Sequence, residues 1–135
     1  MADKKSMKHL VKKTEQDKGF AISIQALNEM MERQAEFAKR FGITQNMTEA
    51  QRERWTKEFV VCILDECSEV LGQINWKHWK KTRQRVDQHE VRFEIIDLLH
   101  FVLSLAVVWG MTADDVAAYY IAKSDENKAR QKRGY

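Results

Sequence analysis

The stretch that decides the fold is Glu90–Gly110, which reads EVRFEIIDLLHFVLSLAVVWG. It is amphipathic at first, and from Ile95 onward it is apolar nearly all round. A helix that is apolar on every side is expected to be covered by its neighbours. The pattern therefore predicts a helix that begins between Arg83 and Glu90, ends at Gly110 and lies at the centre of the core.

Three further helices are predicted around this stretch. The first covers roughly Phe20–Phe41, and Gly42 supplies a left-handed stop. The second begins after Thr48, whose spacing from Gln51 is that of a capping box, and the last begins after Thr112, another capping residue. Helices joined by short links predict an all-α bundle of four to five helices.

The composition agrees with one all-helical domain. The chain has 135 residues, no proline and five glycines, which leaves few turn residues for a β-rich fold and permits long helices. Residues 1–16 are polar and rich in lysine, and we expect them to form a flexible basic arm. Residues 17–135 are expected to form the single domain.

The cysteines and the apolar stretches indicate in which cellular compartment the protein is expected. Cys62 and Cys67 are five residues apart in one predicted helix, so they point to different faces and do not form a disulfide with each other. Such cysteines fit a reducing compartment. The N-terminus lacks the apolar region of a signal peptide, and the apolar stretch Ile95–Trp109 is too short to span a bilayer. The sequence therefore predicts a cytoplasmic protein without a membrane partner.

Two pairs of carboxylates stand at helical spacing on neighbouring predicted helices. Glu66 and Glu69 are three residues apart on the second helix, and Glu94 and Asp97 repeat that spacing on the third. If these helices pack antiparallel, the four carboxylates converge. Each unpaired buried charge costs several kcal/mol, so such a cluster needs cations. Hard oxygen ligands select Mg²⁺, which Mn²⁺ can replace.

The positions of two of these acids distinguish a metal site from ordinary surface charge. Acidic pairs at this spacing are common on solvated helix faces. Glu66, however, interrupts the inward apolar stripe of the second helix, which consists of Trp55, Phe59, Cys62, Ile63, Val70 and Ile74. Asp97 is flanked by apolar residues on both sides. Because both acids occupy positions that favour apolar side chains, they favour a metal site.

Other interpretations of the same residues compete with a magnesium site. Asp97 and His100 are spaced like one ligand pair of a ferritin-like di-iron centre, but the second pair that such a centre needs is missing. We expect His100 to bond a carboxylate or Ser104 instead. The basic run 76–80 would suit a nucleic-acid-binding module, which leaves Glu66 unexplained, and an inactive helical scaffold is a third alternative.

A cationic stripe follows the last predicted helix. Tyr120, Lys123, Asn127 and Arg130 step by three and four residues and therefore share one face. Lys and Arg form charge-assisted bonds with phosphate oxygens, and Asn adds a directed amide bond. By itself the stripe is better explained as a solvated helix end with favourable dipole interactions. Beside a metal site, it predicts a face that binds a triphosphate.

These motifs together resemble those of the all-α nucleoside triphosphate pyrophosphohydrolases, the superfamily of the dimeric dUTPases and the MazG proteins. Their signature is E-x-x-E followed after a spacer by E-x-x-D, here Glu66–Glu69 and Glu94–Asp97. The strings W-K-x-W-K at 76–80 and K-x3-N-x2-R-Q-x2-G-Y at 123–135 place the match nearest the dimeric dUTPase branch, which includes the dCTP/dUTP pyrophosphatase of T-even phages. The resemblance extends from about Gln34 to the C-terminus.

The resemblance implies an activity. A family member hydrolyses dUTP, with dCTP and dUDP as further candidate substrates, to the nucleoside monophosphate, and it requires Mg²⁺ or Mn²⁺. A dCTP-preferring enzyme or a broader, MazG-like pyrophosphatase is the alternative within the superfamily. The family forms homodimers or higher homo-oligomers whose pockets are completed across subunits, and nucleic acid is not an expected partner.

The resemblance also implies roles for individual residues. The residues that bind the metal and position or deprotonate the attacking water would be Glu66, Glu69, Glu94 and Asp97. The residues that hold the phosphates would be Lys123, Asn127 and Arg130. The walls and contacts of the base and sugar pocket would come from Gln34, Trp76, Trp79 and Lys80.

Overall fold

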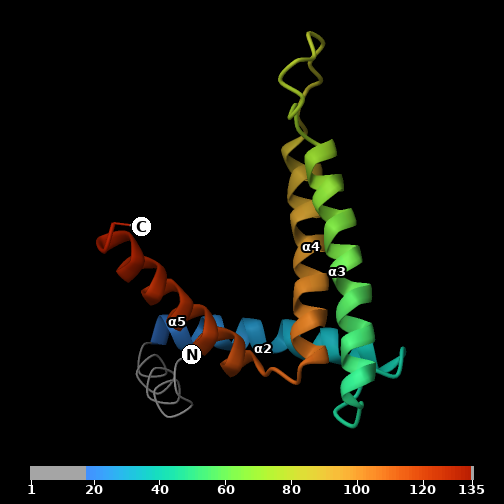
Figure 1. The fold of residues 1–135 in the computed structure, drawn as a ribbon, viewed down its shortest axis with the longest axis vertical. Helices are drawn as coiled ribbons and strands as arrows, with labels where there is room; N and C mark the ends of the chain where they lie inside the picture. The colour runs from blue at the N-terminus through green and yellow to red at the C-terminus, as the bar shows by residue number, and fades with distance from the viewer. Residues whose placement is uncertain (1–17, 135) are drawn as a thin grey trace.

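The computed structural model describes residues 18–134, with side chains from residue 24 onward. Within that range it contains four α-helices and no strand (Figure 1). The helices are α2 (Lys18–Lys39), α3 (Glu49–Gly72), α4 (Gln88–Val108) and α5 (Ala113–Lys132). The prediction of an all-α fold is confirmed, and the basic arm predicted for residues 1–16 lies outside the described residues.

The N-termini of α3 and α5 are set by capping boxes, which confirms the box predicted at Thr48 and the cap predicted at Thr112. The side chain of Thr48 accepts a hydrogen bond from the backbone N–H of Gln51, and the side chain of Gln51 accepts one from the backbone of Thr48. Thr112 and Asp115 make the same reciprocal pair. Each box satisfies backbone donors that have no partner within the first turn.

The C-termini of α2 and α4 are set by glycines. Gly42 and Gly110 have φ values of +77° and +67°, a region that glycine enters without a side-chain clash. After Gly42, the N–H of Ile43 bonds the carbonyl of Ala38 at 3.2 Å, and an equivalent bond follows Gly110. These are Schellman motifs, so both predicted stops are confirmed.

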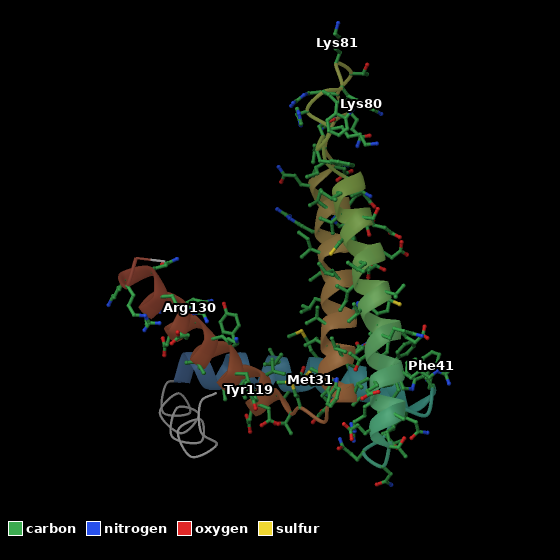
Figure 2. All side chains as sticks on the ribbon, viewed as in Figure 1. Met31, Phe41, Lys80, Lys81, Tyr119 and Arg130 are labelled. Carbon is green, nitrogen blue, oxygen red and sulfur yellow. The ribbon has the colours of Figure 1, made fainter. Side chains whose placement is uncertain are left out.

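α3 and α4 form a long hairpin, and α2 and α5 pack against each other at its base (Figure 1). α3 and α4 lie side by side and antiparallel, and α2 crosses the base of the hairpin and packs against α4. The chain bends by 107° between α4 and α5, and α5 then packs along α2. The loop 73–87 projects from the far end of the hairpin, with Lys80 and Lys81 at its tip (Figure 2).

The buried core lies where α2, the C-terminal end of α4 and the start of α5 meet. It consists of two small clusters: Met31, Leu103 and Ala113 form one, and Ala38, Ile43 and Val108 form the other. The guanidinium of Arg52 on α3 ties this region together, because it donates to the carbonyls of Val108 and Gln45. The base of the hairpin is therefore its best-anchored part.

The prediction that α4 is buried from Ile95 onward is wrong for the single chain. Ile95 is 48% exposed and Val102 is 45% exposed, and the buried residues of α4 are confined to Leu103, Ser104 and Val108. The reason is geometric: along most of its length α4 has only α3 beside it. α3 itself has no buried residue.

Among residues 18–134, no single helix is long and apolar enough to cross a membrane. Taken together, α4 and α5 are long and apolar enough, but the chain bends by 107° between them.

Candidate active site

The hairpin brings three of the four predicted carboxylates to one point. Glu66 lies near the C-terminal end of α3, and Glu94 and Asp97 lie near the start of α4. One oxygen from each of these three side chains lies within 4.8 Å of the others. Antiparallel packing of α3 on α4 produces this convergence, because it places the end of one helix beside the beginning of the next.

Glu66 is the acid of this cluster that has an unsatisfied buried oxygen. Its Oε2 is buried and has no hydrogen-bond partner among the described residues. Desolvation raises the pKa of Glu66, and the charges of Glu69, Asp97, Glu94 and Asp65 raise it further. A buried oxygen without a partner is costly, and a divalent cation shared with Glu94 and Asp97 would satisfy it. The donor set therefore fits Mg²⁺ or Mn²⁺.

Glu69 lies beside this group of three rather than within it. The charge of Glu94 raises the pKa of Glu69 most, followed by desolvation, the charge of Asp65, a hydrogen bond with Glu94 and the charge of Asp97. Glu69 is thus in contact with the cluster, and its raised pKa gives it a greater affinity for a proton than an ordinary glutamate has.

Two further residues contact the cluster: Gln73, which was not identified from the sequence, and His100, which was expected to bond a carboxylate or Ser104. The side-chain Nε2 of Gln73 donates to Oε1 of Glu94 at 3.2 Å. Gln73 follows Glu69 by four residues, and this helical spacing is the signal that could have identified it. Nδ1 of His100 lies 3.6 Å from Oδ1 of Asp97, so His100 contacts a carboxylate, while the hydroxyl of Ser104 donates to the backbone carbonyl of His100 at 3.0 Å.

Gln34 on α2 lies on the same side of α4 as Asp97. Its Nε2 donates to the hydroxyl of Ser104 at 2.6 Å, and Ser104 follows Asp97 by seven residues. Seven residues are about two helical turns, or roughly 10 Å along the axis. The structure thus places Gln34 at one end of a surface that has the carboxylates at the other.

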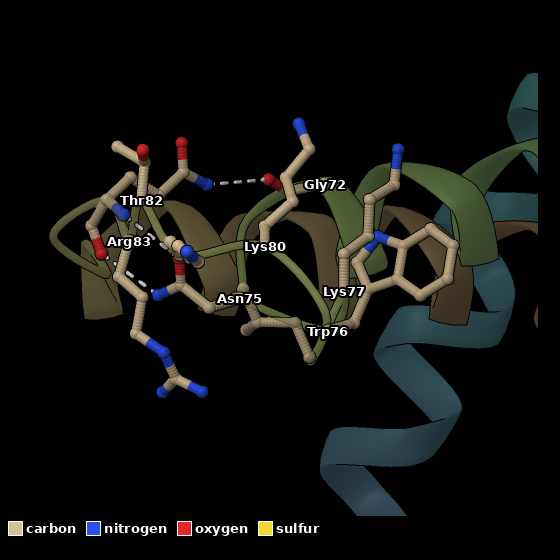
Figure 3. A pocket seen from close by; sticks show the side chains of 10 residues that line it. Gly72, Asn75, Trp76, Lys77, Lys80, Thr82 and Arg83 are labelled. Carbon is tan, nitrogen blue, oxygen red and sulfur yellow. Dashed lines mark hydrogen bonds between the residues drawn. The ribbon is translucent and has the colours of Figure 1, made fainter.

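The predicted base-pocket residues Trp76 and Lys80 line an open hollow of about 630 Å³ in the α3–α4 loop (Figure 3). Trp79 packs edge-on against Trp76, with 5.8 Å between ring centroids. The loop is held by Asn75, whose side chain makes two 2.9 Å hydrogen bonds with the backbone of Gln84. The hollow is basic, and its cationic lining residues are Lys77, Lys80, Lys81 and Arg83.

One chain does not bring Gln34 and this tryptophan loop together. Ser104, which binds Gln34, is 16 residues from Gln88 at the start of α4. That separation is roughly 24 Å along the helix axis, and the loop lies beyond it. Within a single chain, Gln34 and Trp79 are therefore at opposite ends of the hairpin.

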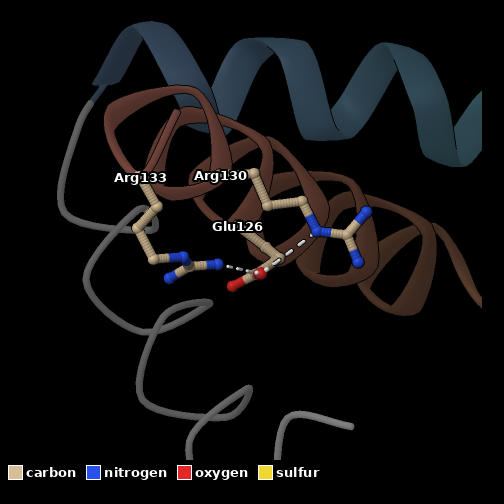
Figure 4. Close-up of polar contacts among 3 residues, drawn as sticks. All are labelled: Glu126, Arg130 and Arg133. Carbon is tan, nitrogen blue, oxygen red and sulfur yellow. Dashed lines mark hydrogen bonds and ion pairs between the residues drawn. The ribbon is translucent and has the colours of Figure 1, made fainter. Parts of the chain in front are cut away.

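The residues of the predicted cationic stripe lie on α5, which diverges from the hairpin that carries the carboxylates (Figure 1). Tyr120, Lys123 and Asn127 line a shallow hollow of about 240 Å³ on α5. Arg130 donates to Glu126 at 3.3 Å, and Arg133 donates to the same carboxylate at 2.9 Å (Figure 4). The hydrogen bond from Arg133, with its charge, lowers the pKa of Glu126. Because α5 diverges from the hairpin (Figure 1), one chain does not bring this stripe to the carboxylates.

The central part of the sequence identifies the family. A profile of the family described as dUTPase matches residues 26–109, which include all four carboxylates, Gln34 and the tryptophan loop. The chain belongs to this family. The match ends before α5, so the family assignment rests on the hairpin and on α2 rather than on the cationic stripe.

Three phage proteins are similar to this family member. The dCTP pyrophosphatase of Enterobacteria phage T4 is 33% identical over 104 residues, covering 60% of this chain and 61% of that protein. The dCTP pyrophosphatase of Enterobacteria phage LZ5 is 38% identical over 71 residues, covering 44% and 41%. A DNA replication protein of phage T4 is 31% identical over 93 residues, covering 52% and 24%. The chain thus spans less than two thirds of each relative, and no solved structure matches it.

Proposed function

We propose that this dUTPase-family chain hydrolyses dUTP and dCTP to the nucleoside monophosphate and pyrophosphate, with Mg²⁺ or Mn²⁺ held by Glu66, Glu94 and Asp97. The observation that carries the proposal is the environment of Glu66: its buried Oε2 has no hydrogen-bond partner among the described residues, and one of its carboxylate oxygens lies within 4.8 Å of oxygens of Glu94 and Asp97. The family profile supports dUTP as a substrate, and the names of the phage relatives support dCTP.

In this proposal three of the four carboxylates bind the cation and the fourth accepts a proton. When bound, the cation would neutralise phosphate charge and make the attacking water more acidic. Glu69 lies outside the three converging acids, and its raised pKa suits it to accept the proton of that water. The bond between the α- and β-phosphoryl groups breaks, and pyrophosphate leaves toward Lys123, Asn127 and Arg130, which neutralise its charge.

We propose that a second copy of the chain completes the pocket. Gln34 lies on the carboxylate side of its own chain and would contact the base. The walls of the pocket for the sugar and the base would be formed by Trp76, Trp79 and Lys80. Gln34 and the tryptophan loop are too far apart in one chain to contact the same base, and the α5 stripe diverges from the carboxylates. At least one of these groups therefore reaches the substrate from the partner copy.

An exposed apolar face on the hairpin supports this homodimer. On α3 it consists of Val60, Leu64 and Leu71, and on α4 it consists of Ile95, Leu99 and Val102, each residue being at least 36% exposed. A helix turns by about 100° per residue, which places both stripes on the side of the hairpin opposite Glu69 and Asp97. Two hairpins packed through this face would form a four-helix bundle and leave the carboxylates open.

The test of the proposed reaction is pyrophosphate release from a panel of deoxynucleoside triphosphates with and without Mg²⁺. We expect turnover of dUTP and dCTP, little turnover of dATP and dGTP, and loss of activity when EDTA is added. Glu69→Gln should lower kcat by about 10²-fold or more, as loss of a general base does, while Mn²⁺ still binds. Glu66→Gln should weaken both activity and Mn²⁺ binding.

The matched control is Glu58→Gln, which changes an exposed acid of the same helix that pairs with Lys57 at 3.9 Å and is expected to leave turnover unchanged. Absence of turnover with both dUTP and dCTP, or turnover that persists in EDTA, would refute the proposal. Salt-sensitive DNA binding without any turnover would point instead to a nucleic-acid-binding module.

A further inference from the structure

Gln73 is the residue through which the end of α3 reaches the cluster of carboxylates. It forms the C-cap of α3, and its side-chain Nε2 donates to Oε1 of Glu94 at 3.2 Å. We infer that Gln73 is a positioning residue that orients Glu94 toward the divalent cation. The inference rests on the metal site of the proposed function and adds a residue that the E-x-x-E and E-x-x-D motifs do not contain.

The geometry holds Gln73 in place without help from the loop that follows it. Its backbone N–H bonds the carbonyls of Glu69 and Val70, both at 3.2 Å, so its Cα is fixed by the last turn of α3. Its side chain is half-buried between α3 and α4. A side chain held in this way has few alternative rotamers, and a group that orients a ligand needs such restraint.

The chemistry of an amide suits this position. An ionised carboxylate offers about four lone-pair sites on two oxygens, so a single N–H on Oε1 leaves capacity for a cation. A Lys or Arg there would neutralise Glu94 and compete with the metal, and among the described residues neither type forms an ion pair with Glu66, Glu69 or Glu94. Gln73 thus bonds Glu94 without reducing the negative charge of the site.

The experiment is a titration of metal-free protein with Mn²⁺, in which free Mn²⁺ is measured by electron paramagnetic resonance in the absence of nucleotide. Gln73→Met keeps the length of the side chain and removes the donor. We expect it to raise the Kd for Mn²⁺ by about 10-fold, the lower end of the range for residues that orient metal ligands.

Gln84→Met is the matched control. The side chain of Gln84 donates to the carbonyl of Gly72 at 3.1 Å, so this variant loosens the same end of the hairpin without touching a carboxylate. Its Kd should stay within about twofold of the wild-type value, well short of the effect expected for a residue that orients a ligand. The melting temperature of each variant without metal verifies that the fold is intact.

The outcomes separate this inference from the proposed reaction. An unchanged Kd in Gln73→Met would overturn the positioning role while the hydrolase proposal stands. If wild-type protein binds no Mn²⁺, both the metal site and the role of Gln73 are overturned. If Gln73→Met binds Mn²⁺ about 10-fold more weakly but the wild type turns over no nucleotide, the positioning role stands and the substrate assignment fails.

Discussion

Glu66 occupies an inward position of α3, on the face that also carries Phe59 and Val70, where an apolar side chain would pack against α4. Its Oε2 is buried without a hydrogen-bond partner among the described residues, and four neighbouring acids raise its pKa beyond the effect of desolvation. A carboxylate in this environment destabilises the metal-free chain unless it is protonated. A bound divalent cation would remove this cost without protonation of the carboxylate.

The raised pKa values of Glu66 and Glu69 predict how stability changes with pH. Above the ordinary value of 4.5, the native metal-free chain binds more protons than the unfolded chain. The free energy of unfolding should therefore fall as pH rises from 4.5 through the raised pKa values. Added Mg²⁺ should stabilise the chain most at the upper end of this range, because it binds ionised carboxylates.

Urea unfolding in EDTA at a series of pH values measures this dependence. Glu66→Gln removes one of the two protonation equilibria, so its free energy of unfolding should decline less over the same range. Glu58→Gln, outside the cluster, should follow the wild-type curve. The same slope in Glu66→Gln and wild type would show that Glu66 does not titrate with a raised pKa.

The helices begin and end where local interactions dictate. Thr48 and Thr112 close capping boxes with residues three positions ahead, and Gly42 and Gly110 reverse the chain in left-handed conformations. Gly110 matters most for the arrangement of elements, because the chain bends by 107° immediately after α4. This bend carries α5 away from the hairpin and toward α2.

Two glycine substitutions test this point. Gly110 has a φ of +67°, and a Cβ there would lie 3.4 Å from Oε1 of Gln45, so Gly110→Ala should lower the free energy of unfolding by about 1–2 kcal/mol. A Cβ added to Gly72, in α3, would meet no neighbouring side chain or loop of the described residues within 4 Å. Gly72→Ala should therefore raise the free energy of unfolding by about 0.5–1 kcal/mol.

Urea unfolding at one protein concentration measures whether each substitution raises or lowers the free energy of unfolding. A stabilised Gly110→Ala variant would mean that the bend after α4 does not need a left-handed residue. A destabilised Gly72→Ala variant would mean that the last turn of α3 is constrained by a contact other than those in the single chain.

At the scale of the whole molecule, much of the hairpin formed by α3 and α4 is uncovered. No residue of α3 is buried, and Leu64 in the exposed apolar face is 65% exposed. Apolar faces of this extent on monomeric proteins mark interaction sites. The diverging α5 and the distant tryptophan loop agree with the proposed homodimer, because one chain does not bring the predicted pocket residues together.

Leu64→Glu tests the proposed homodimer. It places a charge in the centre of the apolar face on α3, and a buried unpaired charge is strongly unfavourable. Light scattering coupled to size-exclusion chromatography should give twice the chain mass of 15.9 kDa for the wild type and the single-chain mass for the variant. The variant should also lose turnover if the pocket is completed across copies.

Val61→Glu is the control for this substitution. Val61 is 58% exposed, but it lies on the polar side of α3 with Asp65 and Ser68, roughly a quarter turn from the apolar face at about 100° per residue. It should therefore keep the dimer mass. A monomeric wild type, or a Leu64→Glu variant that remains dimeric, would exclude this face as the interface.

Much of the fold could be predicted because it depends on short-range interactions. Capping boxes, Schellman glycines and the inward stripe of α3 involve residues a few positions apart, and their patterns are visible in the sequence. The E-x-x-E and E-x-x-D motifs belong to the same category. The roles of Lys123, Asn127, Arg130, Gln34, Trp76, Trp79 and Lys80 stay predictions.

Three features were decided only by the tertiary structure. The 95–102 part of α4 is as apolar as a core helix but is exposed, because only α3 lies beside it. Glu66, Glu94 and Asp97 converge while Glu69 lies beside them, and Gln73 reaches Glu94. Sequence periodicity determines which side of a helix is apolar. Contacts between residues far apart in the sequence, such as Gln34 and Ser104, determine what covers that side, since packing depends on the direction in which each loop sends the next helix.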